Sequence, residues 1–293
     1  MKVRIELAEK NDPAINRVRN ALKAYAPDHM LFDDNPREFD VDLLVMMVNG
    51  RNGRTKRRIA KAKTYNADIA IMQISLISTR NPLVEDWMTI WDDAKLIWSY
   101  YDLPEIARQQ GIEPTFSDKF YRSPLGADSK VFKPSGAEKE YLAIAVTKGY
   151  FAESTREILT AVNHVGAKAV YVGKHIDELH DGIDQFENIT DEELADLYSK
   201  SYYVCALRRR EGQDLPAAEG LLCGARPVVF DRPDQADWSQ SFITIPEINE
   251  ERIISDLIEI FQGKYNPVTG SEIERAKESF SWRAFAEGFW SRI

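Results

Sequence analysis

One segment of the sequence combines three consecutive arginines, two glutamates and the expected start of a helix. Residues 207–231 leave an apolar run, pass the arginines at 208–210, and reach Pro216, a residue that suits a first helical turn. A helix N-terminus offers unpaired backbone N–H groups and a partial positive charge. Flanked by cationic side chains, this segment is suited to binding a diphosphate.

Glu211 and Glu219 lie in the same segment, with seven residues between them. Ionised carboxylates accept strong hydrogen bonds from hydroxyl groups, so a pair that reaches one cleft can hold the ribose and sugar hydroxyls of a nucleotide-activated sugar. Spacing alone favours a plainer interpretation, in which Glu211 is a surface loop residue and Glu219 an ordinary helical glutamate.

Short apolar runs alternate with amphipathic segments in the first half of the chain. The runs lie at 3–7, 40–48, 67–75 and 94–101, and helical spacing follows Pro13. After a polar segment with Pro134 and Gly136, the rhythm restarts with runs at 141–146, 167–173, 202–207 and 226–230. This alternation predicts mostly parallel sheets covered by helices on both faces.

The rhythm therefore predicts an α/β fold with two Rossmann-like, doubly wound domains, which bind ligands at the carboxyl ends of their strands. We expect an N-terminal domain over 1–134 and a C-terminal domain over 135–277. An aromatic-rich helix over 278–293 is expected to pack back on the first domain.

The segment that begins at Glu211 resembles a known signature. Family 4 retaining glycosyltransferases carry E-G-F-G-L-P-x-x-E-A-x-x-C-G-x-P-V-V, and the chain is similar at 211–219, Cys223-Gly224 and 227–229. The chain also resembles three further motifs of this family, in the family's order, at 123–134, 190–198 and 280–282. The resemblance implies a GT-B fold, in which two Rossmann-like domains face each other across a cleft. The domain over 1–134 would then be on the acceptor side, and the domain over 135–277 would bind the nucleotide sugar.

The resemblance also implies roles for individual residues. Glu219 would hold the ribose hydroxyls of the donor, and Glu211, as a catalytic residue, would contact the transferred sugar. Backbone amides would be presented to the sugar and diphosphate by Gly212, Gln213, Asp214 and Leu215. The departing diphosphate would be stabilised by Lys148, which falls where the family has an arginine, and by Arg208, Arg209 and Arg210.

The chain departs from the family pattern at several positions. Glu153 falls where a diphosphate-binding lysine is expected, and Asp214 replaces the second glycine of the signature. Arg156 or one of the arginines at 208–210 could supply the missing charge. Tyr101-Asp102 replaces the acceptor-side His-Asp, which makes Asp102 a candidate catalytic group. The family's glycine-rich first loop is missing, and Arg226 is an extra residue before Pro227.

The resemblance implies a retaining, metal-independent glycosyltransferase, and we expect it to move a hexosyl or pentosyl group from a UDP- or GDP-linked donor without a cofactor. The sequence has no D-x-D motif in a plausible loop, no zinc-like Cys/His spacing and no nicotinamide-binding G-x-G-x-x-G. The main alternative is a catalytically weakened GT-B protein that binds a sugar nucleotide or a glycan. An epimerase or phosphorylase on the same fold is a weaker alternative.

Charge and composition bear on partners. The net charge of -9 argues against a polyanion binder that uses its whole surface. A local basic cluster over 51–63, with Arg57 and Arg58, fits an anionic acceptor such as a lipid-linked glycan, a polysaccharide or DNA, although a solvated helix face explains it too. A protein acceptor and the oligomeric state stay open. Lacking a secretory signal or a membrane-spanning apolar run, the sequence predicts a cytoplasmic protein.

Overall fold

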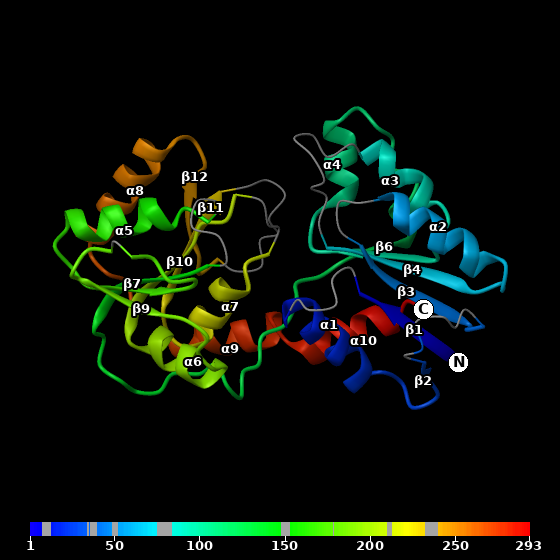
Figure 1. Cartoon of the computed structure of the whole chain (residues 1–293), viewed down its shortest axis with the longest axis horizontal. Helices are drawn as coiled ribbons and strands as arrows, with labels where there is room; N and C mark the ends of the chain where they lie inside the picture. Colours follow the sequence, from blue (N-terminus) through cyan, green and yellow to red (C-terminus); the bar gives the residue numbers. More distant parts are fainter. Residues whose placement is uncertain are drawn as a thin grey trace. The chain divides into compact units, whose positions relative to one another are not determined.

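A computed structural model describes the chain at residues 1–7, 13–33, 35, 40–48, 52–74, 84–147, 153–177, 179–209, 213–231 and 240–293. The chain forms two compact units, each built on one parallel sheet (Figure 1). The first unit contains Met1–Leu125 and Trp282–Ile293, and the second begins at Gly126 and ends at Ser281.

The sheet of the N-terminal unit has six parallel strands in the order β2-β1-β3-β4-β5-β6. These strands are β1 (Lys2–Glu6), β2 (Leu31–Phe32), β3 (Leu43–Val48), β4 (Asp68–Gln73), β5 (Leu96–Ser99) and β6 (Phe120–Arg122). The central strand β3 is buried at every residue, since helices cover both of its faces.

Helices of this unit lie on the two sides of the sheet (Figure 1). One side carries α2 (Asn52–Lys63), α3 (Val84–Trp91) and α4 (Leu103–Gln109), and the other carries α1 (Pro13–Ala24) and α10 (Trp282–Trp290). A short 3-10 turn, Ser117–Lys119, precedes β6. The indole N–H of Trp290 donates to the Leu22 carbonyl at 2.8 Å, which fixes α10 against α1.

The C-terminal unit has its own six-stranded parallel sheet, in the order β12-β11-β10-β7-β8-β9. Its strands are β7 (Tyr141–Val146), β8 (Ala169–Val172), β9 (Ile183–Phe186), β10 (Ser201–Ala206), β11 (Arg226–Asp231) and β12 (Ile243–Pro246). Helices α5 (Thr155–His164) and α8 (Glu250–Gln262) cover one face. The other face is covered by α6 (Asp191–Ser199), α7 (Leu215–Leu222) and α9 (Gly270–Ser279).

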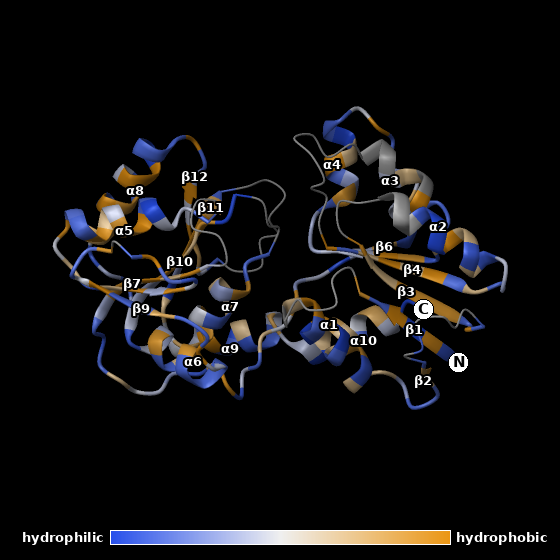
Figure 2. Ribbon diagram, in the orientation of Figure 1, coloured by the Kyte–Doolittle hydropathy of each residue, from blue (hydrophilic) through white to orange (hydrophobic). Residues whose placement is uncertain are grey.

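These strand orders confirm the predicted pair of doubly wound α/β domains. The predicted apolar runs form strands, and Figure 2 shows hydrophobic residues concentrated on both sheets.

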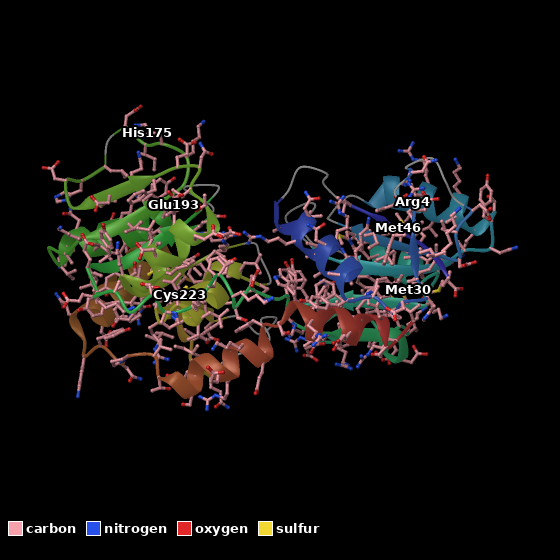
Figure 3. All side chains as sticks on the ribbon, turned by 90° about the horizontal axis from the view of Figure 1, so that it is seen from below. Arg4, Met30, Met46, His175, Glu193 and Cys223 are labelled. Atoms are coloured by element: carbon pink, nitrogen blue, oxygen red, sulfur yellow. The ribbon has the colours of Figure 1, made fainter. Side chains whose placement is uncertain are left out.

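The large aromatic side chains Trp91 and Trp98 are fully buried core residues. Both cysteines are free, and both are buried. Figure 3 places Cys223 inside the C-terminal unit and His175 at its periphery.

The C-terminal unit begins at Gly126, whereas the boundary predicted from the sequence lay between residues 134 and 135. Ala127 and Phe132 belong to the core of the C-terminal unit, and the Ala127 amide donates to the Phe280 carbonyl at 2.8 Å. The expected polar linker is also attached there, since the Lys139 ammonium donates to the carbonyls of Ser201 and Gly224 at 2.7 and 2.9 Å. The expected final helix over 278–293 is divided, because α9 ends at Ser279 and α10 begins at Trp282.

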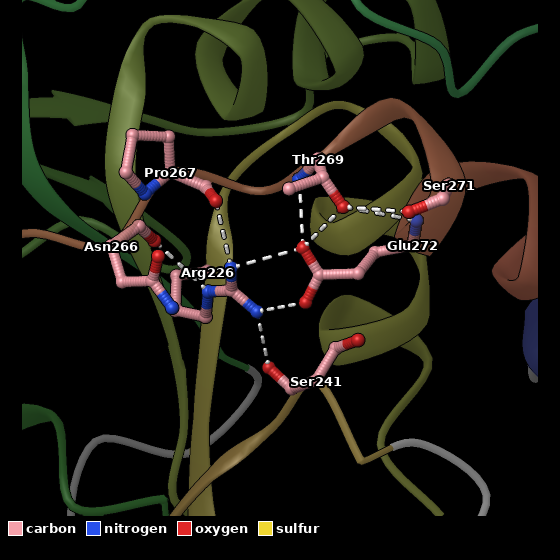
Figure 4. A network of polar contacts seen from close by, with 7 residues as sticks. All are labelled: Arg226, Ser241, Asn266, Pro267, Thr269, Ser271 and Glu272. Carbon is pink, nitrogen blue, oxygen red and sulfur yellow. Dashed lines mark hydrogen bonds and ion pairs between the residues drawn. The ribbon is translucent and has the colours of Figure 1, made fainter.

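Arg226, the extra residue of the signature, is a buried anchor of the C-terminal unit (Figure 4). Its guanidinium makes a two-pronged ion pair with Glu272, at 2.6 and 3.2 Å, and donates to the carbonyls of Ser241, Asn266 and Pro267. Glu272 also completes a capping box with Thr269 at the start of α9. Hydrogen bonding to Arg226 is the main cause that lowers the pKa of Glu272 from 4.5 to about 2.

Helix α7 lies close to β10 because residue 220 is a glycine. A Cβ added to Gly220 would overlap the side chain of Val204, which is fully buried in the centre of the sheet. Close approach of a helix to a strand therefore depends on the missing side chain. This contact determines where the N-terminus of α7 lies relative to the end of β10.

We expect Glu272→Gln to destabilise the protein by about 3 kcal/mol, because it leaves the buried Arg226 guanidinium without its counter-charge. The stabilisation from Glu272 is fully present above pH 4.5 and is lost as the pH falls towards 2, because the folded-state pKa is the lower one. Urea unfolding at several pH values measures both effects. Glu274→Gln, which removes an exposed ion pair with Lys277, is the control and should change stability little.

We expect Gly220→Ala to destabilise the protein by about 2 kcal/mol through overpacking against Val204. In a Val204→Ala background the added methyl group has room, so the same change should cost at least ~1 kcal/mol less. Thermal or urea unfolding of the four variants in this cycle measures the coupling. Gly270→Ala, whose added Cβ would contact nothing within 4 Å, is the control. Additive effects at positions 204 and 220 would contradict the packing argument.

Candidate functional site

The candidate donor site lies where the strand order of the C-terminal sheet reverses. β7 and β10 are adjacent, and the connections that leave them lead to helices on opposite faces, α5 and α7. In a doubly wound sheet, the crevice outside the carboxyl ends of such a strand pair is the general ligand position. The donor-binding residues expected from the sequence follow these same two strands.

Arg208 connects the segments that follow the two strands. Its Nε lies 2.7 Å from Asp214 Oδ1, and its Nη1 lies 3.6 Å from Glu153 Oε1. A further Nη2 contact of 3.5 Å reaches the carbonyl of Val146, the last residue of β7. The three charged side chains are only 13% (Arg208), 5% (Asp214) and 10% (Glu153) exposed, so their charges are weakly screened by water.

Helix α7 begins immediately after this cluster. Asp214 is its N-cap residue, and Pro216 lies in the first turn, as the sequence predicted. Within the part of the chain that the structure describes, the Asp214 side chain makes no capping hydrogen bond to the helix and is paired with Arg208. The positive end of the α7 dipole and the Arg208 guanidinium therefore lie at the same place.

Glu219 lies on the buried side of α7 and is 4% exposed. Its carboxylate accepts a hydrogen bond of 3.4 Å from the hydroxyl of Tyr198, which comes from α6. Complete burial, followed by the charge of Glu219, raises the pKa of Tyr198 well above its ordinary value. Tyr198 therefore stays protonated as a donor and orients the Glu219 carboxylate.

The other arginines near the site have their own partners. Arg209 forms an ion pair with Glu157 of α5 and donates to the Ser154 hydroxyl at 3.3 Å. Arg156 is half exposed and pairs with Glu250 at the start of α8. Among Arg156, Arg208 and Arg209, Arg208 is the one that forms an ion pair with Asp214, the N-cap residue of α7.

Some expected site residues lie outside the described residues, namely Lys148, Arg210, Glu211 and Gly212. Gln213 and Leu215 are described, and both are partly buried at the start of α7. The structure thus brings together Arg208, Asp214 and Glu219 from the expected set. It adds Tyr198 and Glu153 as their partners. Tyr198 belongs to the 190–198 motif, which was the available sequence signal for it.

The acceptor-side candidates lie in the N-terminal unit. Asp102 caps α4 by accepting from the Glu105 amide at 3.1 Å, and it forms an ion pair of 3.1 Å with Arg122. Tyr101 is buried, and its amide donates to the Ser99 hydroxyl. These contacts give Asp102 and Tyr101 structural roles at the start of α4.

The basic cluster on α2 is divided between two environments. Arg57 is exposed, whereas Arg58 forms an ion pair with Glu6 at the end of β1. Glu6 also pairs with the buried Arg4 at 2.7 Å. The sequence did not predict this Arg4–Glu6–Arg58 network. The feature that could have indicated it is the carboxylate of Glu6 near the end of the first apolar run.

Among the residues that the structure describes, no cluster of three or more histidine, cysteine or acidic side chains is arranged to hold a metal ion. Within the same ranges, no helix has the length and apolar character that crossing a membrane requires.

Comparison with solved structures shows the fold. A sucrose-phosphate synthase from Thermosynechococcus elongatus aligns over 99% of this chain and 97% of its own, with a TM-score of 0.76 and 12% identity. Anabaena HepE, solved in complex with UDP, aligns over 100% of both chains with a TM-score of 0.75 and 10% identity.

The pneumococcal O-GlcNAc transferase GtfA, solved with UDP and GlcNAc, aligns over 85% of this chain with a TM-score of 0.64 and 15% identity. This chain spans 56% of the length of GtfA. No family model and no curated protein matches the sequence. The similarities show that the chain has the GT-B fold of glycosyltransferases.

Proposed function

We propose that this chain is a retaining, metal-independent glycosyltransferase of the family 4 type. The observation that carries the proposal is the placement of Glu219: a buried carboxylate, oriented by Tyr198, on the helix that starts at the strand-order reversal. Structural neighbours with the same fold are glycosyltransferases, and HepE and GtfA are among those solved with UDP. No cofactor is required beyond the nucleotide-sugar co-substrate.

The proposed donor is a UDP-linked sugar, with a GDP-linked sugar as the alternative. Glu219 accepts hydrogen bonds from the ribose hydroxyls, which suit an ionised acceptor. Glu211 contacts the transferred hexosyl or pentosyl group, and the 212–215 segment presents backbone amides. UDP is preferred because it is the nucleotide present in the HepE and GtfA structures.

The proposed reaction breaks the bond between the anomeric carbon and the donor diphosphate, and the acceptor oxygen forms the new bond on the same face of the sugar. The proton of the acceptor hydroxyl passes to the departing diphosphate. Negative charge develops on the departing diphosphate while the sugar ring becomes positive. Preorganised cations and a helix N-terminus at the diphosphate lower the barrier for this step. Lys148, the arginines at 208–210 and the start of α7 supply that environment in our proposal.

A binding protein without transfer activity is the second candidate function. One observation favours it: the described side chains around the site include two arginines, Arg208 and Arg209, but three carboxylates that pair with them, Glu153, Glu157 and Asp214. Excess negative charge opposes the binding and departure of a diphosphate. Release of UDP from a panel of UDP-sugars, measured with the acceptor replaced by water, separates an enzyme from a binder.

On the acceptor side, we propose an anionic acceptor that meets the exposed Arg57 of α2. Neutralising Arg57 would then weaken acceptor binding and reduce its salt dependence. Arg58 is a less suitable contact, because Glu6 already neutralises it. We propose a cytoplasmic location for the protein, where nucleotide sugars are available.

The test of the donor site is Glu219→Gln. Loss of charge-assisted hydrogen bonds to the ribose should weaken the binding of both UDP and uridine by roughly 10- to 100-fold. Isothermal titration calorimetry measures UDP, and ligand-observed NMR measures uridine. The exposed Glu259 of α8 provides the matched control, because Glu259→Gln should leave both affinities unchanged. Equal UDP affinity in Glu219→Gln and the unsubstituted protein would remove the basis for the proposed function.

A further inference from the structure

The Arg208 cluster holds one guanidinium and two carboxylates that come from different loops. Asp214 precedes α7, and Glu153 precedes α5, so the cluster bridges the two connections at the strand-order reversal. Both carboxylates are departures from the family pattern, at positions where a glycine and a lysine are expected. Their shared partner gives the two departures a common physical explanation.

The two carboxylates contact Arg208 unequally. Asp214 Oδ1 lies 2.7 Å from Nε, which is direct contact between the two opposite charges. Glu153 Oε1 lies 3.6 Å from Nη1, which is beyond hydrogen-bond range for these two atoms. Asp214 is therefore the closer counter-ion of the guanidinium, and Glu153 is the more distant one.

The charge of the cluster makes the two carboxylates compete with a bound anion. One guanidinium with two carboxylates carries a net charge of -1 while all three are ionised, in a setting that water screens weakly. A diphosphate brings further negative charge to the same place. It can pair with Arg208 only if one carboxylate moves away, and Glu153 is the one that lies farther from the guanidinium.

We infer that the donor diphosphate displaces Glu153 from Arg208, while Asp214 stays bound and positions the guanidinium for the phosphate oxygens. Arg208 has five N–H donors in a planar fork, so its Nε edge can hold Asp214 while its terminal nitrogens meet the diphosphate. Arg208 is then the cation that replaces the expected lysine, Asp214 is a positioning residue, and Glu153 restrains donor binding. The inference rests on the proposed function, because it concerns the same donor site.

The inference predicts opposite effects for two carboxylates on one arginine. Glu153→Gln removes the competing charge and should tighten UDP binding about fivefold or more. Asp214→Asn leaves the guanidinium misdirected and should weaken UDP binding about tenfold. In donor turnover, kcat should fall by a larger factor than KM rises. Arg208→Ala should weaken UDP binding at least ~tenfold and leave uridine binding unchanged, whereas Arg208→Lys should restore part of the affinity.

Titration of UDP and uridine into the full-length variants tests these signs, with thermal unfolding recorded for each. A purely structural cluster would weaken UDP binding in Glu153→Gln and Asp214→Asn alike, and that result would overturn the inference. Equal UDP affinity in Arg208→Ala and the unsubstituted protein would also overturn it. If Arg208→Ala does not fold, Arg208→Lys and Glu153→Gln decide the question, since both keep a cation at position 208.

The result for Glu219→Gln separates the two levels of the argument. Loss of UDP and uridine binding in Glu219→Gln, with no selective loss of UDP binding in Arg208→Ala, contradicts the inference and leaves the proposed donor site standing. An unsubstituted protein that binds neither UDP nor uridine contradicts both.

Discussion

The reversal of strand order between β7 and β10 is the constraint on which the proposed donor site of the C-terminal unit depends. Two adjacent parallel strands send their chains to opposite faces of the sheet, and the space outside their carboxyl ends is left to loop residues. Arg208, Asp214 and Glu153 meet there although they are up to 61 positions apart in the sequence. Gly220 then lets α7 approach β10, so that its N-terminus lies beside the same cluster.

Two arginines of this unit, the buried Arg226 and the partly buried Arg208, show how charge balance separates a structural role from the ligand-binding role that we propose for Arg208. Arg226 meets one carboxylate through two hydrogen bonds and three backbone carbonyls, so its charge is balanced within the fold. Arg208 faces two carboxylates, so these three ionised side chains together carry a net negative charge. A balanced pair gains nothing from a ligand, whereas an unbalanced cluster changes its contacts when another charged group arrives.

The sequence was sufficient for the features that depend on local pattern. Apolar runs predicted the strands because a parallel strand covered on both faces must be apolar along its length, and Pro216 marked the start of α7. The final helix was less predictable. Its aromatic residues suggested one continuous helix, but Phe280 is buried in the C-terminal unit and ends α9, so the chain begins a new helix at Trp282.

Charge pairing was the part that local pattern could not supply. Asp214 replaces a glycine of the signature, and its neighbours in the sequence do not reveal that the fold brings Arg208 to it. The same limit applied to Arg58, whose partner Glu6 lies 52 positions away. A side chain expected from its spacing to face a ligand can be neutralised by a distant residue, and only the strand order shows which one.

The comparison with solved structures adds a last physical step. At 10–15% identity, most side chains have changed while the path of the backbone has been kept, because burial along the strands constrains the fold more than the identity of any loop residue. What a diphosphate requires at the strand-order reversal is positive charge in a fixed direction, and no particular residue has to provide it. In the proposed donor site, an arginine on the exit from β10, held by an aspartate at the start of α7, would meet that requirement as well as a lysine after β7 does. The departures Glu153 and Asp214 are then explained together by their shared partner Arg208, whereas each one alone argues against the proposed site.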